Sequence, residues 1–339
     1  MMKAVSIEAI GKVALTDVAA QEMGPDDVRI KVRYVGLCGS DLNTFRGRNP
    51  LVSFPRIPGH EVAGTVLETG VGVGTEIKPG ISVILWPYSA CGTCKSCQAG
   101  RAYACRYNQT LGVQRDGALR EEIVVPASAV ITNDTLLPRR MALVEPLSVG
   151  FHAARRGSVS KNDTVLVFGC GMIGLGAVFA AARAGARVIA VDPIAAKEAV
   201  ARTCGAGEFL SLTGENLARE IESLTDGHGV DLVIEAVGIP ETFVAAIDLV
   251  GFCGRVVYVG YSKAPVTYET KLFNLKELDI FGSRNASRQD FHDVIAALEE
   301  FGDKADALIT REIPLQEAAG ALPYWDQNPQ DVLKLVVAL

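Results

Sequence analysis

Long apolar runs are missing from this chain of 339 residues. Its most hydrophobic stretches are interrupted by glycine or charge before they reach the roughly 18 to 20 residues that span a bilayer. The N-terminal segment MMKAVSIEAIGK has no apolar block followed by a small-residue cleavage site. The sequence therefore predicts neither a transmembrane helix nor a secretory signal, and we expect a cytoplasmic protein.

Clusters of basic residues are equally scarce. The chain has 33 Lys and Arg against 39 Asp and Glu, a formal net charge of −6, and no segment gathers the basic side chains that a phosphate backbone requires. Aromatic residues make up only 6%, but 49% hydrophobic and 21% charged residues are typical of a folded globular protein. We therefore expect no nucleic-acid or membrane partner. At about 150 residues per domain, the length favours two domains.

Cysteine is infrequent, with eight residues, but four of them crowd into the segment CGTCKSCQAGRAYAC. These four are Cys91, Cys94, Cys97 and Cys105. The spacing lets a looping backbone bring four thiolates to the corners of one tetrahedron, as in a structural zinc site. Disulfides are the weaker interpretation in a reducing compartment. An iron–sulfur cluster is the competing metal site, but the polar surroundings, with Lys95 and Arg101, favour zinc in a lobe of about residues 88–108.

A second motif lies in the run TVLVFGCGMIGLGAVFAAARAGARVIAVD, which reads as a strand, a glycine turn, a helix and a second strand. Gly169, Gly171 and Gly174 form G-x-G-x-x-G. The first glycine allows a tight turn, the second the approach of a pyrophosphate, and the third close packing of helix on strand. Glycine-rich helix starts also occur for packing reasons alone. The complete strand–helix–strand unit nevertheless favours a dinucleotide, whose phosphates meet the helix N-terminus.

The acid that ends the second strand, Asp192, indicates which dinucleotide is bound. Its carboxylate accepts hydrogen bonds from both hydroxyls of an adenosine ribose and repels a 2′-phosphate, so NAD is favoured over NADP. We expect further cofactor contacts from Met172, Ile173, Lys197, Val237, Val259 and Gly260.

Strand-like segments continue beyond this motif, separated by helical patterns, as in a doubly wound parallel sheet. They lie around residues 230–238, 254–260 and 278–283. The N-terminal part has short alternating strands between glycine and proline turns, and the C-terminal apolar strand VLKLVVAL needs a partner. We therefore expect an α/β protein in which a Rossmann-type domain, 148–285, interrupts a β-rich domain of residues 1–147 and 286–339.

Three side chains on separate segments predict a different kind of site. Cys38 ends an apolar run in VGLCGSD, and His60 and Glu61 follow a proline-glycine turn in PGHE. A thiolate, an imidazole and a carboxylate suit a catalytic zinc, which leaves one position open for water or substrate. Each residue alone is ordinary, since a lone Cys is usually a small buried hydrophobe. The prediction rests on the set.

Together these motifs resemble the zinc-dependent medium-chain alcohol dehydrogenases, in the branch that includes sorbitol, polyol and sugar-acid dehydrogenases. CGSD, GHE, the four-cysteine lobe, GVQRDGALREE, EPLSVGFHAARRG, GCGMIG and Asp192 occur in the family's order along nearly the whole chain. The resemblance implies a GroES-like catalytic domain with an inserted Rossmann domain, and a homodimer or homotetramer. It also implies a catalytic zinc on Cys38, His60 and Glu61, with Glu145 as a further ligand or a partner of the metal-bound water.

The reaction implied by the resemblance is oxidation of a secondary alcohol to a ketone by NAD. Zinc would lower the pKa of the bound hydroxyl, and Ser40 would receive its proton. Outside this context Ser40 reads as a simple turn serine. Many relatives carry a histidine in the proton relay where this chain has Asn43. Asn43 cannot titrate, so we expect the route to solvent to use the cofactor ribose or water.

The substrate is indicated by GSRNA and FPRIPGHE, which resemble the L-galactonate and L-gulonate 5-dehydrogenases more than sorbitol dehydrogenases. Arg284 and Asn285 offer a cationic fork and an amide to a substrate carboxylate, which a neutral polyol does not need. Arg115 is expected on a loop that lines the same site. The alternative, to which we give equal weight, is that Arg284 pairs with an acid or contacts the cofactor.

Other functions stay open from the sequence. A neutral-polyol or threonine-type dehydrogenase is the first alternative to a hexonate enzyme, and an NAD-binding regulatory relative without turnover is the second. The intact set of Cys38, Ser40, His60 and Glu61 argues against a pure binder. For assembly, we expect an exposed sheet edge at residues 254–260 that pairs across a twofold axis.

Overall fold

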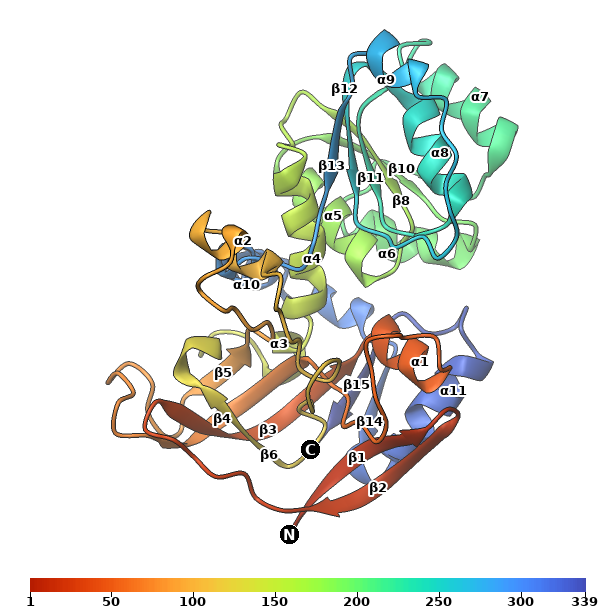
Figure 1. Cartoon of the computed structure of the whole chain (residues 1–339). Coiled ribbons are helices and arrows are strands. Elements are labelled where there is room, and N and C mark those ends of the chain that lie inside the picture. Colours follow the sequence, from red (N-terminus) through yellow and green to blue (C-terminus); the bar gives the residue numbers. More distant parts are fainter. The chain divides into compact units, whose positions relative to one another are not determined.

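The computed structural model describes all residues from Met1 to Leu339. They form two compact units: Met1–Glu145 with Phe291–Leu339 make the first, and Pro146–Asp290 make the second. The second unit is continuous in sequence and interrupts the first, as the colours of Figure 1 show. No helix is long and apolar enough to cross a membrane.

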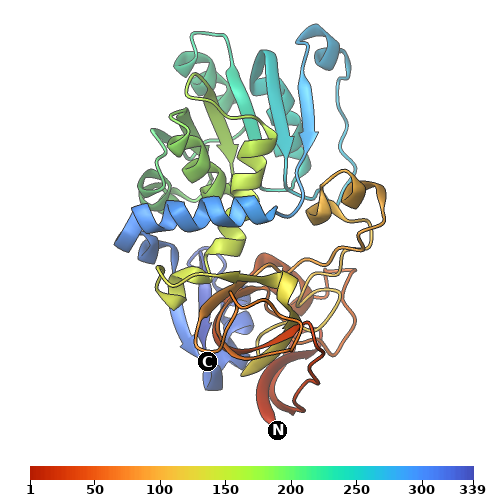
Figure 2. The same cartoon turned by 90° about the vertical axis from the view of Figure 1, so that its left-hand side faces the viewer.

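The first unit is built on a sheet whose strands follow the order β14-β15-β3-β4-β5-β7, with β6 pairing β3 and a separate hairpin of β1 and β2. Its strands are β1 (Met2–Ala9), β2 (Lys12–Val18), β3 (Asp27–Leu37), β4 (Glu61–Thr69), β5 (Ser82–Leu85), β6 (Glu122–Pro126), β7 (Val130–Thr132), β14 (Arg311–Pro314) and β15 (Leu335–Ala338). Figure 2 views this sheet end-on and shows its strands curling around a core.

Strand β3 forms because apolar and charged residues alternate along it. Val28, Ile30 and Val32 are buried, whereas Lys31 and Arg33 between and after them are exposed. The predicted C-terminal strand finds its partners here, since β15 pairs antiparallel with β3 and parallel with β14. The strands β14 and β15 therefore complete a sheet whose first strand in sequence is β3.

Short helices connect these strands. They are α1 (Gly39–Phe45), α2 (Lys95–Gln98), η1 (Ala102–Ala104), η2 (Ala127–Ala129), α3 (Pro138–Met141), η4 (Gly302–Leu308), η5 (Leu315–Gly320) and α11 (Ala321–Gln327). Two longer helices, α4 (Val144–Arg156) and α10 (Arg288–Phe301), begin at the points where the chain passes from one unit to the other.

The second unit is a six-stranded sheet in the order β10-β9-β8-β11-β12-β13, and all its pairs are parallel. The strands are β8 (Thr164–Phe168), β9 (Arg187–Val191), β10 (Glu208–Leu210), β11 (Val230–Glu235), β12 (Val250–Tyr258) and β13 (Asp279–Gly282). The connecting helices are α5 (Met172–Arg183), η3 (Ala195–Lys197), α6 (Glu198–Thr203), α7 (Gly214–Leu224), α8 (Pro240–Leu249) and α9 (Lys271–Leu275). The strand order and the helices on both faces (Figures 1 and 2) confirm the predicted doubly wound fold.

One sequence-based expectation about this sheet is wrong. The segment 254–260 is no edge, because most of it belongs to β12, which lies between β11 and β13. The short strand β13 adds one further parallel pairing and forms the edge itself. Ile280 on this edge strand is 39% exposed.

Asp290, at the start of α10, anchors a buried polar cluster in the second unit. Its carboxylate lies 2.8 Å from His152 Nδ1 and accepts hydrogen bonds from Arg155 and from the Ser287 backbone N–H. Burial opposes its ionisation, but the hydrogen bonds from His152, Ser287 and Arg155 lower the pKa of Asp290 to about 2. The ionised carboxylate therefore stabilises the fold.

We expect Asp290→Asn to lower the free energy of unfolding at pH 7 by about 2 kcal/mol. Because the folded pKa lies below the unfolded value of about 3.9, this stabilisation is complete above about pH 4 and is lost as the pH falls toward about 2. Urea unfolding at pH 7 and at pH 2.5 measures both values. Asp303→Asn, at a side chain that is 98% exposed, is the control. An equal loss from Asp290→Asn at both pH values would contradict the prediction.

Candidate functional site

Backbone pairing brings the three predicted ligands of the first unit together. In the antiparallel pairing of β3 with β4, Gly36 lies opposite Glu61. Cys38 directly follows β3 and His60 directly precedes β4, so this pairing brings the two residues close together in space. The Sγ of Cys38, a ring nitrogen of His60 and a carboxylate oxygen of Glu61 all lie within 4.8 Å of one another. One metal ion fits between such a set of sulfur, nitrogen and oxygen donors.

His60 is buried, and its Nδ1 has no hydrogen-bond partner. Burial opposes its protonation, but the electrostatic attraction of Cys38 and a hydrogen bond to it raise the pKa of His60 well above its ordinary value. A buried imidazole nitrogen without a partner is unusual. Because Nδ1 makes no hydrogen bond, the other ring nitrogen is the one that meets Cys38, and a metal ion shared with Cys38 would bind that nitrogen.

Glu61 is completely buried and has a partner that the sequence did not predict. The ammonium of Lys334 lies 2.6 Å from Glu61 Oε1 and 2.5 Å from Glu61 Oε2, and it also donates a hydrogen bond to the Leu37 carbonyl at 2.9 Å. Burial opposes the charge of Lys334, but Glu61 and Cys38 raise its pKa. Nothing near Lys334 in the sequence indicated this role, because 273 residues separate it from Glu61.

Glu145 is also buried, and Tyr88 holds it. The Tyr88 hydroxyl donates a hydrogen bond of 2.5 Å to Glu145 Oε1, and the Tyr88 ring packs edge-on against Trp86. Burial raises the pKa of Glu145, while the charge of His60 lowers it and that of Glu61 raises it further. Glu145 therefore lies in the electrostatic environment of His60 and Glu61, although it is not part of the donor set within 4.8 Å. Tyr88 is a second site residue that the sequence analysis missed.

Two neighbours of Cys38 on α1 complete this site. Asp41, which is buried, accepts a hydrogen bond of 2.8 Å from the Cys38 backbone N–H and so fixes the start of the helix. The Ser40 hydroxyl is buried and has no partner. It is therefore free to bind a group that enters the site.

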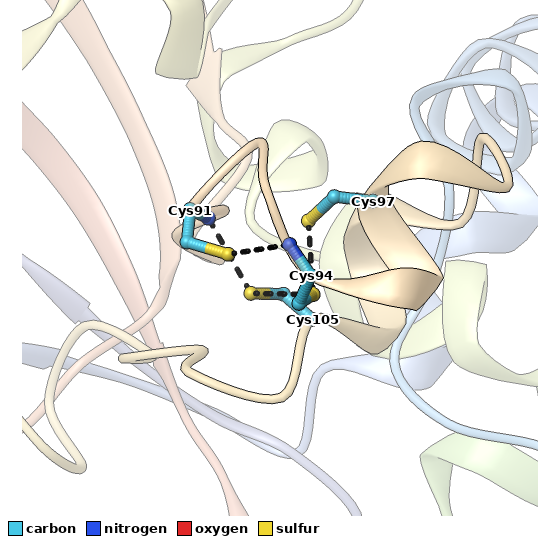
Figure 3. Close-up of side chains that lie close together, drawn as sticks. All are labelled: Cys91, Cys94, Cys97 and Cys105. Carbon is cyan, nitrogen blue, oxygen red and sulfur yellow. Dashed lines mark hydrogen bonds between the residues drawn. The ribbon is translucent and has the colours of Figure 1, made fainter.

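The four predicted cysteines of the lobe converge on one point (Figure 3). The sulfur of Cys94 lies 3.5 Å from that of Cys97 and 3.8 Å from that of Cys105. Backbone N–H groups of Cys91 and Tyr107 donate to the Cys105 sulfur. Hydrogen bonds from Ser96 and the Cys97 backbone lower the pKa of Cys94 to about 5. A low pKa favours the thiolate form of Cys94, and the thiolate is the form of cysteine that binds metals. Together with the four converging sulfurs, this fits the predicted structural zinc.

The glycine turn of the second unit has the geometry of a dinucleotide loop. Gly169 follows β8 with φ of 89°, a conformation that L side chains rarely adopt. A Cβ on Gly174 would lie 1.7 Å from the Gly169 carbonyl oxygen, so this position of α5 requires glycine. Gly171 precedes the helix, and nothing lies within 4 Å of where its Cβ would be. The open space is where a pyrophosphate approaches the backbone.

Asp192 lies at the end of β9, where the sequence placed it. One carboxylate oxygen accepts hydrogen bonds from the Cys170 backbone N–H and from Lys197 Nζ, both at 2.8 Å. The other accepts from the Ile194 backbone N–H at 3.0 Å. The carboxylate is thus fixed in orientation beside the glycine turn, with Lys197 next to it.

Glu235, at the end of β11, is hydrogen-bonded to three of the predicted cofactor residues, Val237, Val259 and Gly260. Its Oε1 accepts hydrogen bonds from the backbone N–H groups of Val237 and Gly238, and its carbonyl accepts from those of Val259 and Gly260. The sequence analysis named Val237, Val259 and Gly260 but missed the buried acid that ties them together. These groups lie at the carboxyl ends of β11 and β12, where open α/β sheets bind ligands.

Comparison with known proteins agrees with this geometry. Residues 24–135 match the family model of the alcohol dehydrogenase GroES-like domain, and residues 173–300 match that of the zinc-binding dehydrogenases. L-galactonate-5-dehydrogenase of Escherichia coli K12 is 31% identical over 314 residues, covering 93% of this chain and 92% of that protein. A sorbitol dehydrogenase of Halalkalibacterium halodurans is 31% identical over 301 residues, covering 87% of each. A zinc-binding dehydrogenase of Sinorhizobium meliloti, solved with NADP, is 32% identical with a TM-score of 0.89 and covers 100% of this chain and 99% of its own.

The chain belongs to the zinc-type medium-chain alcohol dehydrogenases. It is an oxidoreductase that acts on CH–OH donors, with a GroES-like domain and a nucleotide-binding parallel sheet, as the sequence predicted. Zinc and a nicotinamide dinucleotide are the cofactors of this dehydrogenase class, and both the ligand set at Cys38 and the four-cysteine lobe suit zinc.

The loop that carries Arg115 is hydrogen-bonded to the segment that precedes His60. Gly117, Ala118 and Leu119 donate backbone hydrogen bonds to the carbonyls of Ile57, Gly59 and Pro58, with lengths of 2.7, 2.9 and 3.0 Å. These carbonyls directly precede His60. Arg115 is therefore carried on a loop whose end is fixed beside a predicted zinc ligand.

The guanidinium of Arg115 has no acidic partner. Its Nε is buried and has no hydrogen-bond partner, and burial is the sole cause that lowers the pKa of Arg115. The adjacent Asp116 does not compensate it, because its carboxylate accepts hydrogen bonds from Arg56 and from the Ile57 backbone N–H. A partly buried arginine without a partner is suited to bind an anionic ligand.

Arg284 and Asn285 belong to the second unit of this dehydrogenase and follow β13 after one intervening residue, Ser283. Arg284 is exposed. Asn285 has φ of 54°, in the left-handed region that Asn tolerates better than most residues. Before them, the buried Ser283 hydroxyl has no partner, although its backbone N–H bonds to the Tyr258 carbonyl.

Proposed function

We propose that this dehydrogenase oxidises a secondary alcohol of a hexonate, such as L-galactonate or L-gulonate, to a ketone with NAD. The observation that carries the choice of an acidic substrate is the desolvated guanidinium of Arg115, which has no counter-ion in the protein. A neutral polyol offers it no charge to bind, whereas a carboxylate matches its planar fork.

We place the catalytic zinc on Cys38 and His60, with Glu61 and Glu145 as the carboxylates available to it. The fit rests on the chemistry and spacing of the donor set, since the ligand atoms of Cys38, His60 and Glu61 lie within 4.8 Å of one another. When bound there, zinc would supply polarisation of the substrate hydroxyl and NAD would supply the hydride acceptor. The protein residues supply the alignment of the substrate and the path of the proton.

Ser40 is the proposed proton acceptor in this reaction. Its buried hydroxyl has no partner in the protein, so it can accept a hydrogen bond from the substrate alcohol and donate its own proton onward. Asn43, one turn later on α1, cannot take up that proton by titrating. The relay beyond Ser40 therefore uses the cofactor ribose or water.

The preference for NAD over NADP is part of the proposal. Asp192 presents a fixed negative charge beside the glycine turn, and a 2′-phosphate would be repelled there. The Sinorhizobium relative was solved with NADP, and Lys197 beside Asp192 partly offsets the charge. Comparing kcat/KM for NAD and NADP tests this assignment, and an equal or higher value with NADP would contradict it.

We also propose a cytoplasmic homodimer or homotetramer. None of the eight cysteines forms a disulfide, which suits a reducing compartment. The unpaired edge of β13 gives a second copy of the chain a strand to pair with. Light scattering on the purified protein gives the assembly, and a monomer would contradict this proposal.

Replacing Arg115 by alanine should raise the KM for hexonates about 10- to 100-fold, since charge-assisted hydrogen bonds contribute about 1.5–3 kcal/mol. The kcat should change little, because the carboxylate is bound in both the ground state and the transition state. NADH formation with L-galactonate and L-gulonate, beside the neutral sorbitol and galactitol, measures the effect. Arg48→Ala removes an exposed arginine of the same unit and is the control.

The same assay separates the alternatives. A loss confined to Arg284→Ala would move carboxylate recognition from Arg115 to Arg284. Turnover of sorbitol or galactitol with no preference for the acids would instead identify the enzyme as a neutral polyol dehydrogenase. A regulatory relative would bind NAD but form no NADH from any of these alcohols, or from threonine, with zinc bound.

A further inference from the structure

The proposed reaction does not explain why the ammonium of Lys334 is buried against Glu61. We propose that Lys334 is a positioning residue that acts as a built-in counter-cation for Glu61, and that it keeps the catalytic metal site folded when zinc is absent. This inference rests on the proposed zinc site at Cys38, His60 and Glu61.

The first step of the argument is charge. Cys38, Asp41, Glu61 and Glu145 place several groups that can be negative in one desolvated region of the first unit. Against them stand His60 and Lys334, and Lys334 alone is paired directly with a carboxylate. A buried carboxylate without a counter-charge is strongly unfavourable. Once zinc leaves, the ammonium of Lys334 is the cation that remains on Glu61.

The second step is geometry. An ammonium has three N–H donors, and Lys334 directs them to Glu61 Oε1, Glu61 Oε2 and the Leu37 carbonyl, at 2.6, 2.5 and 2.9 Å. All its donors are therefore used within the protein. The Leu37 carbonyl directly precedes Cys38, so one ammonium ties together the segments that carry two of the proposed ligands.

The third step is the rigidity of the frame around this ion pair. Lys334 directly precedes β15, whose Leu335 pairs with Leu37 on β3, and β3 in turn pairs Gly36 with Glu61 on β4. A Cβ on Gly36 would lie 2.0 Å from Glu61 Oε2, so the carboxylate rests against the α-carbon of that glycine. Three adjacent strands thus carry both partners of the ion pair.

The pairing leaves Glu61 able to bind zinc. Two carboxylate oxygens offer about four lone-pair positions, and Lys334 occupies one on each oxygen. Zinc and Lys334 can therefore share Glu61. Zinc would then bind to donor groups that are already in position, and it would not have to order them.

Thermal unfolding of the full chain, metal-free and zinc-loaded, tests the proposal. Lys334→Met keeps the length of the side chain and removes its charge, whereas Lys334→Arg keeps the charge. We expect Lys334→Met to lower the Tm of the metal-free protein at least twice as much as that of the zinc-loaded protein, and Lys334→Arg to lower both less. Removing the charge of Glu61 as well, in Lys334→Met/Glu61→Gln, should restore most of the metal-free Tm.

The zinc of the four-cysteine lobe contributes equally to every variant and cancels in this comparison. Equal losses of Tm by Lys334→Met in the two states would overturn the inference, as would a double variant no more stable than the single one. If Lys334→Met fails to fold, the double variant and Lys334→Arg still decide between the outcomes.

A separate readout distinguishes failure of this inference from failure of the proposed zinc site. In a cobalt titration of the metal-free protein the four-cysteine lobe also absorbs, so the band of the Cys38 site is the part of the visible spectrum that is lost in Cys38→Ser. This band should be retained in Lys334→Met. Without any such band the zinc assignment fails. With the band present and the Tm losses equal, only the role of Lys334 fails.

Discussion

Turnover should fall by more than about 100-fold when Cys38 is replaced by serine, since loss of residues that only support metal ligands already costs about 10- to 100-fold. The serine hydroxyl is not deprotonated near neutral pH, so the site loses its thiolate while keeping His60 and Glu61. Metal analysis should show one zinc fewer per chain, and NADH formation from the preferred substrate gives the loss of activity.

Cys253→Ser is the matched control for this experiment, because Cys253 is an exposed free thiol of the second unit outside both metal sets. Its metal content and kcat/KM should equal those of the unchanged enzyme. Cys38→Ser with full zinc content and activity within tenfold of the parent would contradict the assignment of Cys38 as a zinc ligand.

Replacing Cys105 by serine should unfold the four-cysteine lobe. Cys105 is the fully buried member of the set, and its sulfur contacts that of Cys94 and accepts two backbone N–H groups. Structural zinc contributes about 10–16 kcal/mol of apparent binding free energy in zinc-finger peptides. The lobe has short helices and no sheet of its own to replace this contribution.

Limited trypsin digestion should then cut the Cys105→Ser variant at Arg101 and Arg106, whereas the parent protein should resist cleavage there. Metal analysis should find one zinc ion fewer per chain in the variant than in the parent protein. The lobe stands away from the sheet of its own unit (Figure 2), so we expect local unfolding. Iron with sulfide in the parent protein would support the competing cluster interpretation. Unchanged resistance to trypsin would contradict a structural metal here.

The parts of the site that the sequence predicted share one property: their residues are close together in the chain or belong to short motifs. The turn from Gly169 to Gly174 and the run from Cys91 to Cys105 specify their geometry locally, through backbone conformation and loop length. The grouping of Cys38 with His60 came from matching ligand types and from the family resemblance. Strand pairing of β3 with β4 is the physical cause of their proximity.

The residues that the sequence did not indicate depend on contacts between distant segments. Tyr88 meets Glu145 across 57 residues and Lys334 meets Glu61 across 273. A tyrosine after a proline, or a lysine before an apolar strand, has no local pattern that predicts such a partner. The mistaken sheet edge at 254–260 has a similar origin, because apolar pattern identifies a strand but not its place in the sheet.

The position of β14 and β15 after the inserted unit has a consequence for synthesis on the ribosome. Residues 146–290 are contiguous, so this unit has its whole sequence available while the last segment is still being made. The sheet of the first unit lacks β14 and β15 until residues 311–338 have been translated. The inserted unit can therefore fold first, and the first unit acquires Lys334 only after the whole inserted unit has been translated.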